Sequence, residues 1–207
     1  MPALNPGLPL DYAANGMFQL GYVFADISGP LDHYVQIMGS SSFVQLKDAR
    51  LLDQTYCGCP LEIRQNIAFG FVGSLNVELI EPLEGVSCYS TFLAAHPNGG
   101  LHHFGCKVSD FDRATGDLEM SGFGMAQAGR FGSGTRFAYF DTRVALGHYL
   151  DVLFFDQATE TLFNDLKKGR GFGATVKWRP GVRWRASRAA GRTVRPFRFR
   201  PPPSRAQ

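Results

Sequence analysis

The stretch QLGYVFADI, residues 19–27, aligns without gaps with the stretch HFGCKVSDF, residues 103–111. The two copies share Gly21 with Gly105 and Asp26 with Asp110. In each copy the residues alternate like those of a half-buried strand, and a helix pattern follows, over residues 28–38 and 112–120. An internal repeat of this kind indicates a duplicated structural unit.

The later parts of the two units correspond more loosely. Each places one acid inside an apolar strand, Glu78 in residues 76–80 and Asp151 in residues 149–153, and another β-rich run precedes each strand. We therefore expect an α+β fold of two βαβββ modules, residues 17–84 and 100–156, in one domain over residues 15–160. The Gly- and Pro-rich connection is expected to hold a short helix near residues 89–95, and another is expected near 159–168.

Charge divides the chain into two parts. Residues 174–207 hold ten of the 21 Lys and Arg and none of the 18 Asp and Glu, so the body before them is acidic. The basic segment is rich in proline and has no periodicity, which predicts a disordered tail. Its aromatic and basic residues suit nucleic acid, but the acidic body makes nucleic acid an unlikely partner. An alternative is that the native reading frame is lost near Gly173.

Hydrophobic residues make up 44% of the 207, which is typical of a folded soluble protein. No apolar run approaches the roughly 18 residues of a membrane helix, and the N-terminus lacks the pattern of a signal peptide. We therefore expect a cytoplasmic protein without membrane partners. Exposed sheet edges make a homodimer plausible, although no residue identifies an interface.

Four polar side chains fall at repeat-equivalent positions on the predicted strands. Gln19 pairs with Glu78 in the first module, and His103 pairs with Asp151 in the second. Two buried carboxylates repel each other and are costly without a cation. One imidazole, one amide oxygen and two carboxylates suit a hard or borderline divalent ion. The pattern predicts one divalent metal ion, of unknown identity, held by Gln19, Glu78, His103 and Asp151.

Each of these residues alone has a common explanation, as a solvated amide or an acid on the exposed face of a sheet. It is their equivalence in the repeat that favours a metal site. Strict alternation turns His102 to the opposite side of the strand from His103, so we expect a neighbour rather than a ligand. Aromatic strand residues are usually core, but four are candidates to line the site: Tyr22, Phe69, Phe140 and Tyr149.

Four segments of the chain together resemble the vicinal oxygen chelate superfamily, which includes glyoxalases, bleomycin resistance proteins and extradiol dioxygenases. The resemblance is strongest to its glyoxalase-like and methylmalonyl-CoA-epimerase-like branches. The resemblance rests on FQLGYVFADISGPLDHY, NVELIEPLEG, FLAAHPNGGLHHFGCKVSDFDRA and FAYFDTRVALGHYLDVL, which span most of residues 17–155. It implies a cupped mixed sheet with a divalent metal at its centre that binds two adjacent substrate oxygens.

The resemblance also implies roles for the four residues. The family's ligand positions fall on Gln19, Glu78, His103 and Asp151, and the last departs from the usual Glu. Aspartate is one methylene shorter, so it could bind directly, bind through water or leave the position open. The implied activity is that of an isomerase or lyase that transfers a proton next to a carbonyl through a metal-bound enolate, with Glu78 or Asp151 as the base.

Two alternatives share the expected scaffold. An extradiol-type dioxygenase would hold iron with two histidines and one carboxylate, and Gln19 in place of a histidine argues against it. A non-catalytic small-molecule-binding protein would use the cup without metal, and the four retained polar positions argue against that.

Overall fold

The structure is a computed structural model of the chain, and it describes residues 16–38, 43–132, 134–169 and 175–177. The first half of the described chain carries strands and helices in the order β1 (Met17–Val23), α2 (Ser28–Gln36), β2 (Phe43–Ala49), β3 (Leu52–Tyr56), β4 (Cys59–Pro60), β5 (Arg64–Val72) and β6 (Leu75–Glu84). The second half carries α3 (Cys88–Ala95), β7 (Gly100–Lys107), α4 (Phe111–Met120), β8 (Met125–Phe131), β9 (Thr135–Phe140), α5 (Arg143–Leu146), β10 (Tyr149–Phe154), α6 (Gln157–Lys167) and β11 (Thr175–Lys177).

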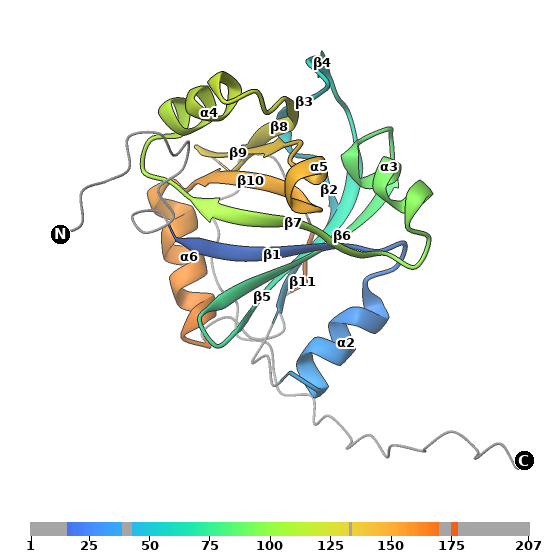
Figure 1. The fold of residues 1–207 in the computed structure, drawn as a ribbon. Coiled ribbons are helices and arrows are strands. Elements are labelled where there is room, and N and C mark those ends of the chain that lie inside the picture. Colours follow the sequence, from blue (N-terminus) through green and yellow to red (C-terminus); the bar gives the residue numbers. More distant parts are fainter. Residues whose placement is uncertain (1–15, 39–42, 133, 170–174, 178–207) are drawn as a thin grey trace, which may run out of the picture.

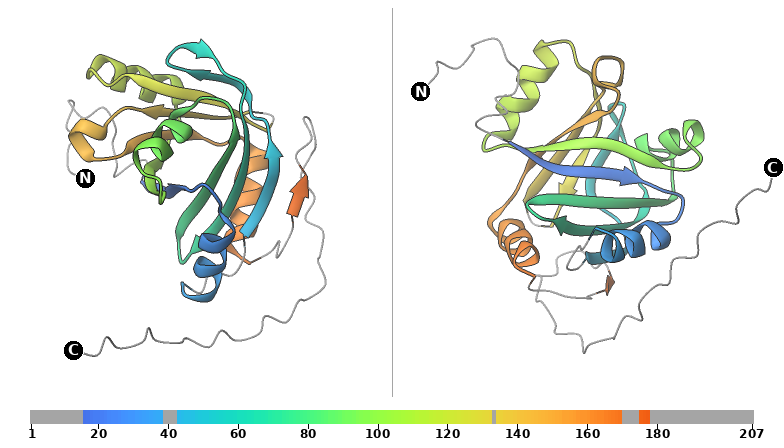
Figure 2. Two further views of the ribbon diagram at one scale, coloured as in Figure 1. Left: turned by 90° about the vertical axis from the view of Figure 1, so that its right-hand side faces the viewer. Right: turned by 60° about the horizontal axis from the view of Figure 1, so that its bottom comes forward.

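All the strands that the structure describes belong to one mixed sheet, in the order β11-β2-β5-β6-β1-β7-β10-β9-β8-β3-β4. The sheet curls into a cup, with α2 and α4 on its outer side (Figures 1 and 2). The expected α+β class with a cupped mixed sheet is therefore confirmed. Within the described residues, no helix is long and apolar enough to cross a membrane.

The middle of the sheet carries the repeat. β1 and β7 are antiparallel neighbours, β6 runs parallel to β1, and β10 runs parallel to β7. Gly21 is in register with Glu78, and Gly105 is in register with Asp151. Because Gly21 corresponds to Gly105 in the repeat, Glu78 and Asp151 occupy equivalent places, as the sequence predicts.

Side-chain caps fix where the later helices begin. The Asp110 carboxylate accepts a hydrogen bond from the Arg113 N–H at 3.1 Å, and the Asp156 carboxylate accepts one from the Thr159 N–H at 2.8 Å. Ser87 and Ser90 form a capping box at the start of α3. The helices expected near residues 89–95, 112–120 and 159–168 are thus confirmed to within two residues.

The hairpin β3–β4 joins the two halves of the sheet in a way that the repeat does not predict. It lies between β2 and β5 in the chain, yet β3 pairs with β8 at the edge of the second half. At its tip, Cys57 and Gly58 both have positive φ, as a two-residue turn requires. The second half of the sheet therefore gains an outer strand from the first.

The basic tail expected from residue 174 lies outside the described residues except for β11. These three residues pair in parallel with β2, so strand replaces the disorder expected there. Thr and Val favour strands, and the edge of β2 that is not paired with β5 offers hydrogen-bonding groups to this segment.

Candidate functional site

The centre of the concave face brings together all four residues that the repeat singles out. Gln19, Glu78, His103 and Asp151 are 2%, 7%, 0% and 1% exposed. They come from the four central strands β1, β6, β7 and β10, two from each half of the sheet. The first, second and fourth line one cavity. The predicted set thus converges on one buried place.

Distances within the set are short. His103 Nε2 lies 3.2 Å from an oxygen of Glu78 and 4.0 Å from an oxygen of Asp151. Two ligands of one ion, each 2.0–2.2 Å from it, can be no more than about 4.3 Å apart, so both distances suit a shared ion. Asp151 stands farther off, as expected for the shorter acid.

The two shared glycines make room for the polar side chains of the opposite module. Gly21 faces His103 across the β1–β7 pair, and Gly105 faces Gln19. A Cβ on Gly21 would lie 1.8 Å from His103 Cε1, and one on Gly105 would lie 2.9 Å from Gln19 Oε1. Any larger residue at either position would displace a candidate ligand. The need for this space explains why both positions are glycine.

The amide of Gln19 is oriented by a neighbour on β6. Its Nε2 donates to Asn76 Oδ1 at 2.9 Å, and Asn76 Nδ2 donates to the Gly70 carbonyl at 2.9 Å. Because Nε2 of Gln19 is bound to Asn76, its Oε1 is the amide atom that remains without a partner beside the cavity. An amide oxygen can bind a cation, whereas an amide nitrogen cannot.

His102 does not follow the expected alternation. The β1–β7 register shifts between Gly21 and Tyr22, so that Tyr22 pairs with Leu101 and His102 is left as a bulge. The rings of both histidines contact Tyr139, with centroids 5.6 and 4.7 Å from it. The prediction that His102 points away from His103 is therefore wrong, because the bulge turns both side chains to one side.

The bulge also has a counterpart in the first module. The same strand pair shifts register between Met17 and Gln19, which leaves Phe18, the repeat partner of His102, out of register. Phe18 packs against Phe155 and Phe163, which line the same cavity as Gln19. Each module thus delivers two successive side chains to the concave side.

Burial holds the set in its uncharged forms when no cation is present. It raises the pKa of Glu78 to about 8 and lowers that of His103 to about 3. Burial, reinforced by the charge of Glu78, raises the pKa of Asp151 well above its ordinary value. The acids therefore lack a positive partner that would stabilise their charged forms.

Three of the four side chains have a buried atom without a hydrogen-bond partner. These atoms are Gln19 Oε1, His103 Nε2 and Asp151 Oδ1. Buried polar atoms are nearly always paired in folded proteins, so three orphans at one place indicate a missing partner. Within the described part of the chain, however, no three His, Cys, Asp or Glu side chains stand ready to hold a metal ion. The donor types fit a divalent cation, and the side chains would have to close around it.

Three further residues of this place, Tyr89, Tyr139 and Asn76, are not among the candidates from the sequence. Tyr89 from α3 donates its hydroxyl to that of Tyr139 at 3.0 Å, and both are buried beside the histidines. Asn76 lies two residues before Glu78, on the same face of the strand, and that spacing could have marked it.

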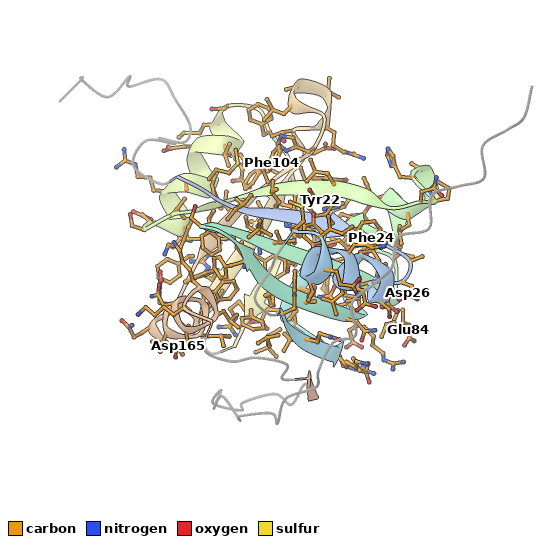
Figure 3. All side chains as sticks on the ribbon, turned by 90° about the horizontal axis from the view of Figure 1, so that it is seen from below. Tyr22, Phe24, Asp26, Glu84, Phe104 and Asp165 are labelled. Atoms are coloured by element: carbon orange, nitrogen blue, oxygen red, sulfur yellow. The ribbon has the colours of Figure 1, made fainter. Side chains whose placement is uncertain are left out.

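The four aromatic candidates divide between the two faces of the sheet. Phe69 lines the cavity, and Tyr149 packs on His102 with ring centroids 4.7 Å apart. Tyr22 and Phe140 lie on the outer side. Phe140 packs with α4, and Tyr22 packs beside α2 (Figure 3). The prediction that these two line the cup is wrong, because their positions in the alternation turn them outward.

Comparison with known families settles the relationship. The sequence model of the Glyoxalase/Bleomycin resistance protein/Dioxygenase superfamily matches residues 18–140. The chain belongs to this superfamily. A search of curated proteins found no match.

Solved structures share the fold of this superfamily member. One is a hypothetical protein from Bacillus halodurans C-125, with a TM-score of 0.51 and 20% identity over 70% of this chain and 96% of the other. Another is methylmalonyl-CoA epimerase from Mycobacterium tuberculosis, with a TM-score of 0.51 and 19% identity over 73% of this chain and 96% of the other. At these identities the likeness shows the fold alone.

Proposed function

We propose that this superfamily member holds one divalent metal ion through Gln19, Glu78, His103 and Asp151. The protein then acts as an isomerase or lyase that moves a proton next to a carbonyl group. The observation that carries the proposal is the convergence of three orphan atoms, Gln19 Oε1, His103 Nε2 and Asp151 Oδ1, from both modules on one buried place. The epimerase among the solved structures of like fold supports the reaction type.

When bound, a divalent ion stabilises the negative charge that develops on a substrate oxygen as the neighbouring carbon loses its proton. Glu78 and Asp151 are the candidate proton carriers, because both line the cavity and neither forms an ion pair with Lys or Arg among the described residues. Gln19 is held by Asn76 as a neutral oxygen donor, and it cannot compete for the proton. The buried walls keep water away from the reacting carbon.

The test has a binding arm and a reaction arm. The purified protein is analysed for bound metal, and exchange of deuterium from solvent into the carbon next to the carbonyl is followed in acyl thioesters and hemithioacetals. We expect about one metal ion per chain and measurable exchange. His103→Ala should remove both, whereas His96→Ala, at an exposed histidine outside the cavity, should remove neither.

Variants of the two acids then identify the base. Glu78→Gln and Asp151→Asn keep the shape of each side chain and remove its ability to take a proton. The variant that retains metal but loses exchange marks the base. Oxygen uptake with a catechol would instead favour the dioxygenase, and ligand binding that survives complete removal of metal would favour the non-catalytic binder.

A further inference from the structure

The cavity beside the four polar residues is largely apolar. Away from Gln19, Glu78 and Asp151, it runs between β5 on one side and β8 and β9 on the other. Its walls there are mainly aliphatic and aromatic side chains, among them Ile67, Phe69, Phe131, Phe137 and Leu153. Among the described residues that line it, none is Lys or Arg. An anionic group in this space would have no counter-charge to compensate its desolvation.

Helix α6 forms the end of the cavity. Phe163 lies with its ring centroid 5.2 Å from that of Phe69 and 4.8 Å from that of Phe155. Two polar contacts fix the helix to the sheet: the Lys107 ammonium meets Glu160 at 2.6 Å, and the hydroxyl of Thr135 meets that of Thr159 at 2.7 Å. Phe163 is thus a fixed wall, and Lys107 already has an acidic partner.

One buried side chain in the wall points to a neutral ligand. Gln65 is fully buried and lines the cavity, and neither its amide nitrogen nor its amide oxygen has a hydrogen-bond partner. It lies four residues before Phe69, the residue paired with Glu78. Phe163 packs on Phe69 and Phe71, so Gln65 and Phe163 lie toward opposite ends of the cavity, with Glu78 between them. An uncharged hydroxyl, carbonyl or amide would satisfy Gln65.

We infer that the substrate carries an uncharged alkyl or aryl group that fills the space between the four polar residues and Phe163 and ends against the ring of Phe163. This inference rests on the proposed function for the two-oxygen end of the substrate. The apolar end depends only on the cavity walls. A substrate with a free carboxylate at that end is excluded by the same walls.

Hydroxamic acids test the inference, because each offers two adjacent oxygens on a variable chain. Binding to the Co²⁺-loaded protein is measured by calorimetry for acetohydroxamate, hexanohydroxamate and the monohydroxamate of adipic acid. We expect hexanohydroxamate to bind at least tenfold more tightly than either of the others. Equal affinities, or a preference for the acid, would overturn the inference while leaving the metal site intact.

A second arm does not need metal. Chelator-treated protein is titrated with p-cresol and with 4-hydroxybenzoate, which carries a carboxylate in place of the methyl group of p-cresol. Binding is followed by the methyl NMR signals of Ile67 and Leu153. Saturable shifts with p-cresol alone support the inference. No shift with either compound overturns it, whatever the outcome of the metal analysis.

Phe163 is tested by shortening it. Phe163→Ala should improve the affinity for octanohydroxamate relative to hexanohydroxamate by at least fivefold. Leu162→Ala, a partly buried neighbour on α6 that does not line the cavity, should leave that ratio unchanged. If thermal melting shows that Phe163→Ala does not fold, Phe163→Leu is used, with a smaller change in the same direction. An unchanged ratio in a folded variant would contradict the role of Phe163.

Discussion

The Nδ1 atoms of His102 and His103 lie 3.0 Å apart, although the two residues are successive in one strand. One ring must donate this hydrogen bond and the other must accept it. If His103 uses Nε2 for a metal ion, its Nδ1 carries the proton and His102 is the acceptor. His102 therefore orients a candidate ligand without touching the ion itself.

Replacement of His102 should weaken metal binding. His102→Phe suits the aromatic surroundings of Tyr89, Phe92 and Tyr149 but cannot accept the bond from His103. We expect a loss of about tenfold or more in metal affinity with little loss of fold. His102→Asn, which keeps an acceptor atom, should lose less. Equal affinity in His102→Phe and the natural protein, measured by competition with a chromogenic chelator, would remove His102 from this role.

Substitution of Gly21 should damage the metal site more than the fold. In Gly21→Ala the new Cβ overlaps the His103 ring, so the ring must leave its position. We expect metal stoichiometry to fall below about a tenth of the natural value. Gly116→Ala in α4 is the matched control, because its Cβ meets nothing within 4 Å. It should retain metal and gain about 0.5–1 kcal/mol of stability. Normal metal content in Gly21→Ala would contradict the arrangement.

Asn76 should matter for both stability and metal binding. Asn76→Ala leaves Gln19 Nε2 and the Gly70 carbonyl without their buried partner, which is expected to cost about 1–3 kcal/mol. The freed amide of Gln19 can also turn its nitrogen to the cavity, so metal affinity should fall. Asn66→Ala, which removes only an exposed bond to the Asp48 N–H, is the control for urea unfolding. A loss of stability with unchanged affinity would limit Asn76 to a structural role.

From the titration of Glu78 and His103, the metal-free protein should lose stability as pH rises above about 6.5 and as pH drops below about 4.5. Glu78 has a pKa of about 8 when folded against an ordinary 4.5, so the folded form binds more protons and stability falls as pH rises through this range. His103 has a pKa of about 3 against an ordinary 6.5, so its contribution to stability is lost as pH drops from 6.5 toward 3; between 6.5 and 4.5 Glu78 offsets this loss. Melting temperatures in chelator should follow this curve, and Glu78→Gln should flatten its alkaline side. An unchanged alkaline slope in that variant would contradict the shift.

The repeat was enough to predict the central strands and the four residues that meet there. Alternation assigns a face to Gln19, Glu78 and Asp151, and the shared glycines align the two modules. The alternation rule failed at His102 because a bulge depends on how two strands pair. The sequence of one strand alone does not predict that pairing.

Long-range packing was beyond the sequence pattern. The hairpin β3–β4 pairs with β8, some 70 positions further along the chain, and the residues of the hairpin do not predict this pairing. The same holds for Phe163, whose place in α6 predicts burial but not that it closes the cavity. The apolar character of the cavity emerges only when strands of both modules face each other.

The crossed arrangement of the glycines has an evolutionary consequence. Because each half clears space for a donor of the other, a one-unit ancestor would have needed two copies of itself around a dyad to build such a centre. Fusion of the copies would allow each position to diverge, which accounts for an amide and an imidazole, and for a longer and a shorter acid, at equivalent places. Each half of the present chain carries only two of the four donors, so separated halves are expected to lose the centre.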